Sequence, residues 1–445
     1  MLKAAWTLAI ETLSWIELKG LSERSALNRT IRQLGMKDPE VIGLAYRLVY
    51  ETIRRKNLID FILHSALQPR DLDDFRLGLR AFLRLYTHET RLLNGGFGEA
   101  VNTAQLGRSI LGWRELQETE KVLGKILNVP YDLLSRAFSD EKKKALLTSN
   151  PEWFVNYSYW LLGRAEALRY LESTIEIPPT YIRINTLKGS EKDLLKKVEA
   201  EGVTLEKVPK LRHTYSVIKN QRRLTKTASF RDGAFYIQDK ASCLAIEVAD
   251  PQAGETVLDI CAAPGAKTTY LAQLMRNKGA IYSIDYSKRR MRVWTRETKR
   301  MDVKIATPVV ADVNDLLPVN VSADVLILDP PCTGTGVFHK MPSAKWRLTR
   351  KSIRDMAAIQ SEMLNRCAKA VKRSGRLVYS TCSITLEENE MLIERFLKWH
   401  PEFELVATSP RMGLPGFRGQ RKCQRLYPHI HECNGFFVAK LCKEA

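Results

Sequence analysis

The sequence contains no run of about 20 apolar residues, the length that a helix needs to cross a bilayer. Apolar residues still make up 44% of the 445 residues and charged residues 27%, which excludes a chain that is disordered throughout. At about 100–200 residues per domain, this length predicts two to four domains.

Acidic residues are few relative to basic ones. The chain has 50 Asp and Glu against 70 Lys and Arg, and its formal net charge is +20. An excess of this size favours a polyanionic partner, with nucleic acid first and an anionic membrane second. The alternative is a protein that is merely basic.

Cysteine is absent from the first 242 residues, and the eight cysteines from Cys243 onward fit no disulfide framework. The apolar N-terminal segment is interrupted by Glu11, repeats at helical spacing and is followed by no small-residue cleavage site. We therefore expect a cytoplasmic chain with free thiols.

The front of the chain shows helical patterns only. Asp38, Pro39 and Glu40 form an N-terminal helix signal, and an apolar face at helical spacing runs from Val41 to Ile53. Further patterns cover 75–86 and 118–127, and Asn94–Gly96 breaks the series. We expect residues 1–145 to form a helical bundle, without which the rest of the chain would still fold.

After residue 145, the sequence pattern changes twice along the chain. Within 146–235, the segment 181–187 alternates like a strand. From 236 onward, short β-branched segments alternate with helical stretches or loops, at 256–260, 280–284, 305–310, 325–328 and 377–379. This alternation predicts a doubly wound α/β fold with a mostly parallel sheet.

Two basic segments contain no acidic residue. Residues 207–231 carry eight Lys and Arg with Tyr215 and Phe230 between them, and residues 339–354 carry six with Trp346. Like charges at this density favour a phosphate backbone as counter-charge. A solvated surface is the alternative for both segments.

The segment Val257–Thr268 combines a strand, a turn of small residues and a helix start. Small residues let the backbone approach a ligand, and Asp285, at the end of the next strand, can accept hydrogen bonds from ribose hydroxyls. The turn lacks both the GxGxxG and the P-loop patterns. A nucleoside without phosphates, such as S-adenosylmethionine, fits better.

Two cysteines follow predicted strands. Cys332 lies in DPPCTGTG and Cys382 in YSTCS. The carboxyl ends of parallel strands share one edge, so we expect the two thiols to meet there. A cysteine in place of the aromatic residue of an amino-methyltransferase motif favours carbon as the acceptor, because a thiolate can activate a cytosine ring by addition. The alternatives are plain turns and small core residues.

These motifs resemble the RNA cytosine-5 methyltransferases of the Sun/Nop group. That family has CAAPGGKT, D-A-P-C-S/T-G-x-G and S-T-C-S where this chain has CAAPGAKT, DPPCTGTG and YSTCS. Matches at Arg183–Thr186, Tyr236–Asp239 and Gly435–Phe437 extend the likeness over about residues 180 to 441. The helical front resembles the NusB-like extension of the bacterial rRNA branch, the RsmB type.

The resemblance implies a Rossmann-like class I methyltransferase domain at 236–445. A small α/β RNA-binding domain (146–235) and an all-α NusB-like RNA-binding domain (1–145) would precede it. It also implies S-adenosylmethionine as cofactor and transfer of a methyl group to carbon 5 of cytosine in RNA, with rRNA favoured.

By the same resemblance, Cys382 is the nucleophile that adds to carbon 6. Cys332 helps to remove the carbon-5 proton and to release the enzyme, and Asp329 faces both cofactor and base. Ala266 and Pro330 depart from the family pattern without removing a functional group. The implied cofactor-binding residues are Cys261, Ala262, Ala263, Pro264, Gly265, Ala266 and Lys267 at the methionine end, Asp285 at the ribose, Arg290 near it, Asp312 near the adenine, and Asp329.

Other interpretations are weaker. On a strand, His429, His431 and Cys433 would share a face, but with Cys423 their spacing matches no zinc pattern, so we expect no metal. Rival functions are the same chemistry on tRNA, a non-catalytic ribosome-assembly factor and a DNA cytosine methyltransferase using Cys332 as nucleophile. The intact Cys382 and cofactor turn argue for activity, and the S-T-C-S motif argues against the DNA enzyme. We expect a monomer without a membrane partner.

Overall fold

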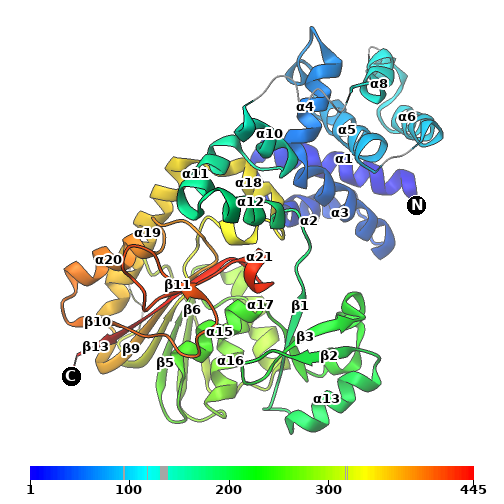
Figure 1. Cartoon of the computed structure of the whole chain (residues 1–445). Helices are drawn as coiled ribbons and strands as arrows, with labels where there is room; N and C mark the ends of the chain where they lie inside the picture. Colours follow the sequence, from blue (N-terminus) through cyan, green and yellow to red (C-terminus); the bar gives the residue numbers. More distant parts are fainter. Residues whose placement is uncertain (94–95, 118, 131–138, 316, 318, 445) are drawn as a thin grey trace. The chain divides into compact units, whose positions relative to one another are not determined.

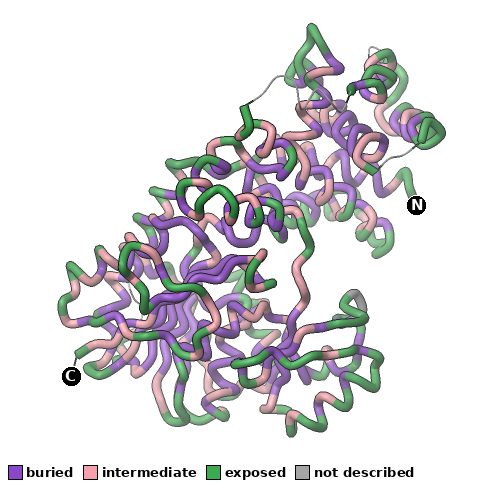
Figure 2. The backbone as a smooth tube through the Cα atoms, viewed as in Figure 1, coloured by how far each residue is buried: buried purple, intermediate pink, exposed green. Residues whose placement is uncertain are grey.

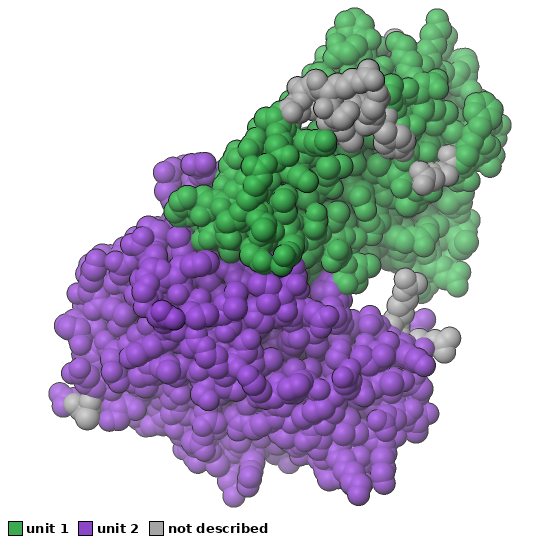
Figure 3. Space-filling view, viewed as in Figure 1, with its two compact units in different colours: residues 1–177, 338–347 green, residues 178–337, 348–445 purple. Residues whose placement is uncertain are grey.

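The structure is a computed structural model that describes residues 1–93, 96–117, 119–130, 139–315, 317 and 319–444. The chain divides into two compact units (Figure 3). The first contains residues 1–177 and 338–347, and the second contains 178–337 and 348–445. Most of the predicted break at Asn94–Gly96 lies outside the described residues. The division into three domains stays a prediction.

The described part of the first unit is built of helices, as the 3.6-residue spacing predicts (Figure 1). Trp6 and Leu13 of the first helix are buried in one apolar core. Asp38 caps α3, because its carboxylate accepts a hydrogen bond from the backbone N–H of Glu40 at 2.8 Å. The elements are α1 (Leu2–Lys19), α2 (Glu23–Gln33), α3 (Pro39–Arg54), α4 (Lys56–Leu67), η1 (Leu72–Asp74), α5 (Leu77–Thr87), η2 (His88–Leu92), α6 (Phe97–Leu111), α7 (Trp113–Gln117), α8 (Glu120–Leu127), α10 (Asp140–Leu147), α11 (Glu152–Leu162), α12 (Arg164–Ser173) and α18 (Pro342–Arg347).

The second unit begins with a small antiparallel sheet of order β2-β3-β1-β4. The predicted strand at 181–187 is β1, although it ends earlier than expected, at Ile184. The elements of this part are β1 (Thr180–Ile184), α13 (Glu191–Ala200), β2 (Thr204–Lys207), β3 (Thr214–Lys219), η3 (Gln221–Lys226), α14 (Ala228–Arg231) and β4 (Phe235–Ile237).

The rest of the second unit is the predicted doubly wound fold. The main path of its sheet has the order β11-β12-β13-β9-β8-β5-β6-β7, and β10 pairs with β13. Strands β9, β8, β5, β6 and β7 are parallel neighbours. The elements are α15 (Lys240–Ala249), β5 (Thr256–Ile260), α16 (Ala266–Leu274), β6 (Ala280–Asp285), α17 (Lys288–Arg300), β7 (Ala306–Val310), β8 (Ala323–Leu328), η4 (Thr335–Val337), α19 (Arg350–Ala368), β9 (Val371–Thr381), α20 (Glu390–Trp399), β10 (Phe403–Val406), β11 (Leu414–Pro415), β12 (Gln424–Leu426), α21 (Pro428–His431) and β13 (Phe436–Lys443).

Both faces of the large sheet are buried, and Figure 2 shows its strands as mostly buried. Alternate residues of one strand enter different cores: Leu326 packs with α19 and α20, whereas Val325 packs with α15 and α16. Burial on both faces explains why these strands read as continuous apolar runs. In the part of the chain that the structure describes, no helix has the length and apolar character needed to cross a membrane.

Candidate active site

Four neighbouring strands of the large sheet bring the predicted residues to one edge. The turn of Cys261 follows β5, and Asp285 ends β6. Asp329 directly follows β8, and Cys382 directly follows β9. Because parallel strands end on the same side, residues up to 121 positions apart in sequence gather at this edge.

The two thiols meet as expected. The Sγ atoms of Cys332 and Cys382 lie 3.1 Å apart. The hydrogen bond with Cys382, burial, and the nearby carboxylates of Glu388 and Asp329 raise the pKa of the Cys332 thiol well above its ordinary value. This environment favours the protonated Cys332 thiol, and either sulfur of the pair can donate the hydrogen bond.

Asp329 links this thiol pair to the turn after β5. Its Oδ2 accepts a hydrogen bond from Lys267 Nζ at 2.5 Å, and its Oδ1 accepts one from Ser380 Oγ at 3.1 Å. Burial alone would lower the pKa of the Lys267 ammonium, but Asp329 outweighs burial and raises it. Lys267 therefore stays charged and fixes the carboxylate, a contact that its place in the turn did not predict.

The turn itself uses two left-handed backbone positions. Gly265 has φ +109°, and a Cβ placed there would lie 3.2 Å from Trp294 Cδ1. Cys261 has φ 64°, a conformation that costs a residue with a side chain about 1–2 kcal/mol. Ala266 is the first residue of α16, where the backbone is right-handed. The alanine that replaces the family's second glycine thus needs no glycine-specific conformation.

Asp285 is fully buried and already bonded. Its carboxylate accepts hydrogen bonds from the backbone N–H groups of Ala263 at 3.3 Å and Ser287 at 3.0 Å. Arg290 pairs with it at 3.0 Å while remaining 44% exposed. The guanidinium therefore occupies one acceptor that a ribose would need. Asp312 is exposed beyond the end of β7, and its carboxylate accepts a hydrogen bond from the backbone N–H of Asn314.

Asp259, on β5 below the turn, was not predicted as a site residue. Its Oδ2 accepts a hydrogen bond from Thr268 Oγ1 at 2.5 Å, whereas its buried Oδ1 has no hydrogen-bond partner among the described residues. Burial raises the pKa of this carboxyl from 3.8 to about 7. The only sequence signal is an acidic residue inside a strand that is otherwise buried.

Comparisons with known proteins identify the family of this chain. A family model described as 16S rRNA methyltransferase RsmB/F matches residues 246–442, and a model of the N-terminal domain of 16S rRNA methyltransferase RsmF matches residues 151–240. The chain belongs to the RsmB/F methyltransferase family. A probable ribosomal RNA small subunit methyltransferase B of Bacillus subtilis (strain 168) is 28% identical over 450 residues, covering 98% of each chain.

Two solved structures extend the likeness of this RsmB/F-family chain. The crystal structure of PH0851 has 29% identity and a TM-score of 0.84, and the match covers 100% of this chain and 99% of that one. The crystal structure of NSun6 from Pyrococcus horikoshii with SFG has 28% identity and a TM-score of 0.62, covering 67% of this chain and 100% of that one. The first match spans both units.

The methyltransferase site fits a nucleoside joined to an amino acid. Small residues and a helix start surround the turn, and the unpartnered Asp259 Oδ1 can accept a hydrogen bond from an ammonium. Asp285 offers a carboxylate at the next strand end once the exposed Arg290 side chain gives way. The residues at this edge therefore fit S-adenosylmethionine, because they offer acceptors for its ammonium group and for its ribose hydroxyls.

Part of the basic segment 207–231 is neutralised within the second unit. Lys207 pairs with Glu191, and Arg212 pairs with Glu247. Tyr215 is buried, and its hydroxyl donates a hydrogen bond to Glu191. Its ring is therefore not available for base stacking. Exposed charge remains at Lys210, Lys219, Lys226 and Arg231.

RNA contact by the second basic segment stays a prediction for its exposed residues, but one of its six basic residues is excluded from it. Its residues 339–347 belong to the helical unit. Lys345 is fully buried and donates hydrogen bonds to Ser149 O and Thr174 Oγ1, and burial, with Arg54 nearby, lowers its pKa well below the ordinary value. Lys345 cannot contact a phosphate from this position.

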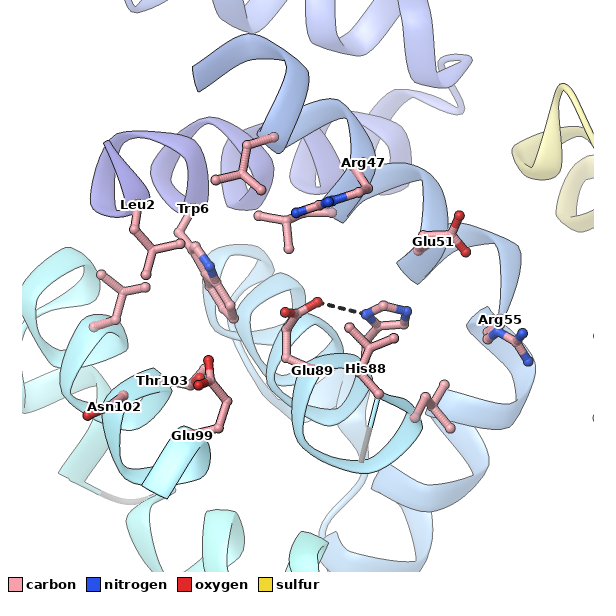
Figure 4. Close-up of a pocket in the computed structure, with 15 residues that line it drawn as sticks. Leu2, Trp6, Arg47, Glu51, Arg55, His88, Glu89, Glu99, Asn102 and Thr103 are labelled. Atoms are coloured by element: carbon pink, nitrogen blue, oxygen red, sulfur yellow. Dashed lines mark hydrogen bonds and ion pairs between the residues drawn. The ribbon is translucent and has the colours of Figure 1, made fainter. Parts of the chain in front are cut away.

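The helical unit contains a cavity of about 490 Å³ that no sequence motif predicted (Figure 4). Arg47 and Arg55 line it, but so do Glu51, Glu89 and Glu99. In Figure 4, a dashed line joins the His88 ring to Glu89, and these atoms lie 3.0 Å apart. The acidic groups offset the arginines, so this cavity gives no support to phosphate binding by the helical unit.

The structure does not place the histidines on a strand, the condition under which they would share a face. His429 and His431 lie in the short helix α21, because Pro428 starts a helix there. The shared strand face on which chelation depended is therefore missing. Within the described residues, no group of three His, Cys, Asp or Glu side chains could hold a metal ion.

Proposed function

We propose that this chain transfers a methyl group from S-adenosylmethionine to carbon 5 of a cytosine in small-subunit rRNA. One observation carries the chemistry. The Cys332 and Cys382 sulfurs lie 3.1 Å apart, and the Asp329 carboxylate and the turn after β5 are at the same edge of the sheet. The family model and the Bacillus relative are both described as small-subunit rRNA methyltransferases, and this supports small-subunit rRNA as the substrate. The monomeric state and the cytoplasmic location stay predictions.

The cofactor would be held by the turn Cys261–Lys267 and by Asp285, and when bound it supplies the methyl group. Arg290 would swing away from Asp285 as the ribose arrives. Asp312 would lie near the adenine. The solved NSun6 structure with SFG supports a ligand of this type at the corresponding fold.

The chain's own residues activate the cytosine. The Cys382 thiolate adds to carbon 6 and forms a C–S bond, which moves electron density onto carbon 5. The proton that the Cys382 thiol loses on addition moves to the ring nitrogen, whose N–H then donates a hydrogen bond to Asp329. The base must leave its stack to reach these groups, so the substrate cytosine lies in a loop or bulge, or is flipped out.

Release reverses the addition. Cys332 takes the carbon-5 proton, the electron pair of that C–H bond re-forms the carbon 5–carbon 6 double bond, and the C–S pair returns to Cys382. The proton that Cys332 carried passes to the departing Cys382 sulfur across their 3.1 Å contact. The ring nitrogen gives up its proton to water as the ring regains its double bonds, so each turnover releases one proton and needs no further reagent.

Single substitutions test the two thiol roles. Cys382→Ala should abolish methyl transfer and leave S-adenosylhomocysteine binding intact, since the thiol acts on the base. Cys332→Ala should accumulate a covalent RNA–protein adduct that a denaturing gel detects with labelled RNA. An adduct, or full turnover, in Cys382→Ala would contradict the assignment and make Cys332 the nucleophile.

The substrate RNA is a separate test. Purified 16S rRNA and tRNA, each incubated with the enzyme and S-adenosylmethionine, are analysed by bisulfite sequencing. New 5-methylcytosine in 16S rRNA supports the proposal. Modification of tRNA alone would replace rRNA as the substrate, and no modification of either would favour the non-catalytic factor.

A further inference from the structure

Glu388 is a fully buried carboxylate that none of these roles uses. It lies in the loop between β9 and α20, six residues after Cys382. Its side chain receives hydrogen bonds from both loops that carry the thiols.

On the Cys332 side, Glu388 binds Thr333, the residue that follows Cys332. Its Oε1 accepts a hydrogen bond from the backbone N–H of Thr333 at 2.9 Å, and its Oε2 accepts one from the Thr333 hydroxyl. Gln360 Nε2 donates to Glu388 Oε1 and to the carbonyl of Pro331, each at 2.9 Å. The residues on both sides of Cys332 are thereby tied to one carboxylate.

On the Cys382 side, the same carboxylate again holds the next residue. Its Oε2 accepts hydrogen bonds from Ser383 Oγ at 2.6 Å and Thr385 Oγ1 at 2.8 Å. The backbone carbonyl of Glu388 accepts one from the Tyr379 hydroxyl at 2.7 Å. Glu388 thus bridges two loops whose cysteines are 50 residues apart.

An uncharged side chain cannot make this set of bonds. The carboxylate accepts from five donors with two oxygens, whereas an amide has one acceptor oxygen and a nitrogen that would face the hydroxyls. Among the described residues, no Lys, Arg or His pairs with Glu388, so these donors alone compensate its buried charge. Retaining such a charge costs stability unless all its bonds are made.

We propose that Glu388 is a positioning residue that holds the Cys332 sulfur against Cys382 for the release step. The proposal rests on the assigned roles of the two thiols. Loss of the carboxylate removes the acceptor that the two loops share. Only their direct contacts then remain, such as Thr333 Oγ1 with Ser383 Oγ at 3.4 Å and the Gly336 N–H with Cys382 O at 2.9 Å, so the two sulfurs are held together less closely. Addition of Cys382 to carbon 6 continues, whereas removal of the carbon-5 proton and proton transfer to the departing sulfur slow down.

The first experiment follows the covalent adduct in the full-length enzyme. Glu388→Gln is mixed with labelled 16S rRNA and S-adenosylmethionine, and adduct and free methylated RNA are separated on a denaturing gel. We expect release to slow on the order of tenfold or more, because a 1 Å displacement can cost about a hundredfold. Adduct should then accumulate, and adding Cys332→Ala should raise it no further.

The second experiment measures the geometry without RNA or cofactor. Diamide takes two electrons and two protons from the two thiols, which join as a disulfide, and mass spectrometry quantifies the linked peptides. Glu388→Gln should form the Cys332–Cys382 link on the order of tenfold more slowly than the native chain. This readout separates the positioning role from the methyl-transfer chemistry.

A buried carboxylate away from the thiols serves as control. Glu247 is buried and bonds to Arg212 and Tyr270, so Glu247→Gln should keep the native adduct fraction and linking rate. If Glu388→Gln does not fold, Thr333→Val removes one of its bonds and carries the same test. A native linking rate, or activity that falls together with thermal stability at an unchanged adduct fraction, would refute the positioning role.

Discussion

At the residue scale, the buried Asp259 makes stability depend on pH. Its pKa is about 7 in the folded protein against an ordinary 3.8, so the folded state binds more protons between those values. Stability is then lost as pH rises through this window and is recovered below it.

We predict that the free energy of unfolding falls more steeply with pH in the native chain than in Asp259→Asn. The difference between pH 5 and pH 8 should be on the order of 2 kcal/mol, at about 1.4 kcal/mol per pH unit. Urea unfolding at both pH values measures it. The exposed Asp312→Asn should behave like the native chain, and parallel profiles for Asp259→Asn would contradict the assignment.

The ribose site is the second prediction at this scale. Asp285→Ala should weaken S-adenosylhomocysteine binding by about 10- to 100-fold, since hydrogen bonds to a charged group contribute about 1.5–3 kcal/mol. Arg290→Ala should weaken it less, because the removed guanidinium frees an acceptor on Asp285. Calorimetry gives both constants, and equal losses would assign Arg290 a direct cofactor contact.

At the scale of elements, η4 and β13 approach each other through glycine. A Cβ on Gly336 would lie 2.1 Å from Gly435 O. The N–H of Gly336 donates to Cys382 O at 2.9 Å, and the N–H of Gly435 donates to Gly336 O at 2.8 Å. Any side chain at Gly336 must therefore displace the loop that carries Cys332.

We predict that Gly336→Ala lowers methyl transfer at least about tenfold while S-adenosylhomocysteine binding stays near native, because the cofactor turn is on another strand. Single-turnover assays and calorimetry measure the two effects. Gly43→Ala on α3, where a Cβ meets nothing within 4 Å, is the matched control. Native transfer by Gly336→Ala would show that the loop tolerates the displacement.

At the scale of the whole molecule, the helical unit includes a segment from much later in the chain, residues 338–347. Trp346 donates its indole N–H to Ile53 O at 2.7 Å and packs against the helical core. The sequence-based expectation that the chain folds without residues 1–145 stays a prediction, but it did not foresee that 338–347 pack in the helical unit. The partners of this segment in α3 would be removed.

We predict that a chain lacking residues 1–145 melts at lower temperature and is cleaved by protease within 338–347. Trp346→Ala in the full-length chain should reproduce part of the loss, because this partly buried ring loses its packing on the helical core and its hydrogen bond to Ile53 O. The cost should be below the roughly 3–5 kcal/mol of truncating a fully buried aromatic side chain. Calorimetric melting and peptide mapping measure both. A truncated chain as stable and as protease-resistant as the native one would contradict the shared core.

RNA affinity is the last prediction at this scale. Lys219, Lys226 and Arg231 are exposed on the small-sheet part of the second unit. Replacing all three with Ala should make the slope of log affinity against log salt shallower by about 0.7–0.9 per lost phosphate contact. Filter binding of 16S rRNA at several salt concentrations measures it, and an unchanged slope would locate the RNA elsewhere.

The sequence by itself determined the sheet and the gathering of Cys261, Asp285, Cys332 and Cys382. Each lies in or beside a turn that ends a strand, and parallel strands end at one edge, so strand order along the chain is enough to bring them together. It could not place His429, because a proline-initiated turn of helix and a short strand look alike over four residues.

Only the tertiary structure decided which polar groups meet inside. Glu388 bonds to Thr333 across 55 residues, and Lys345 bonds to Ser149 across 196. No periodicity reports such pairs, because hydrogen bonding and burial depend on how separate elements pack. The same holds for Asp259, whose raised pKa comes from burial and not from any neighbour along the chain.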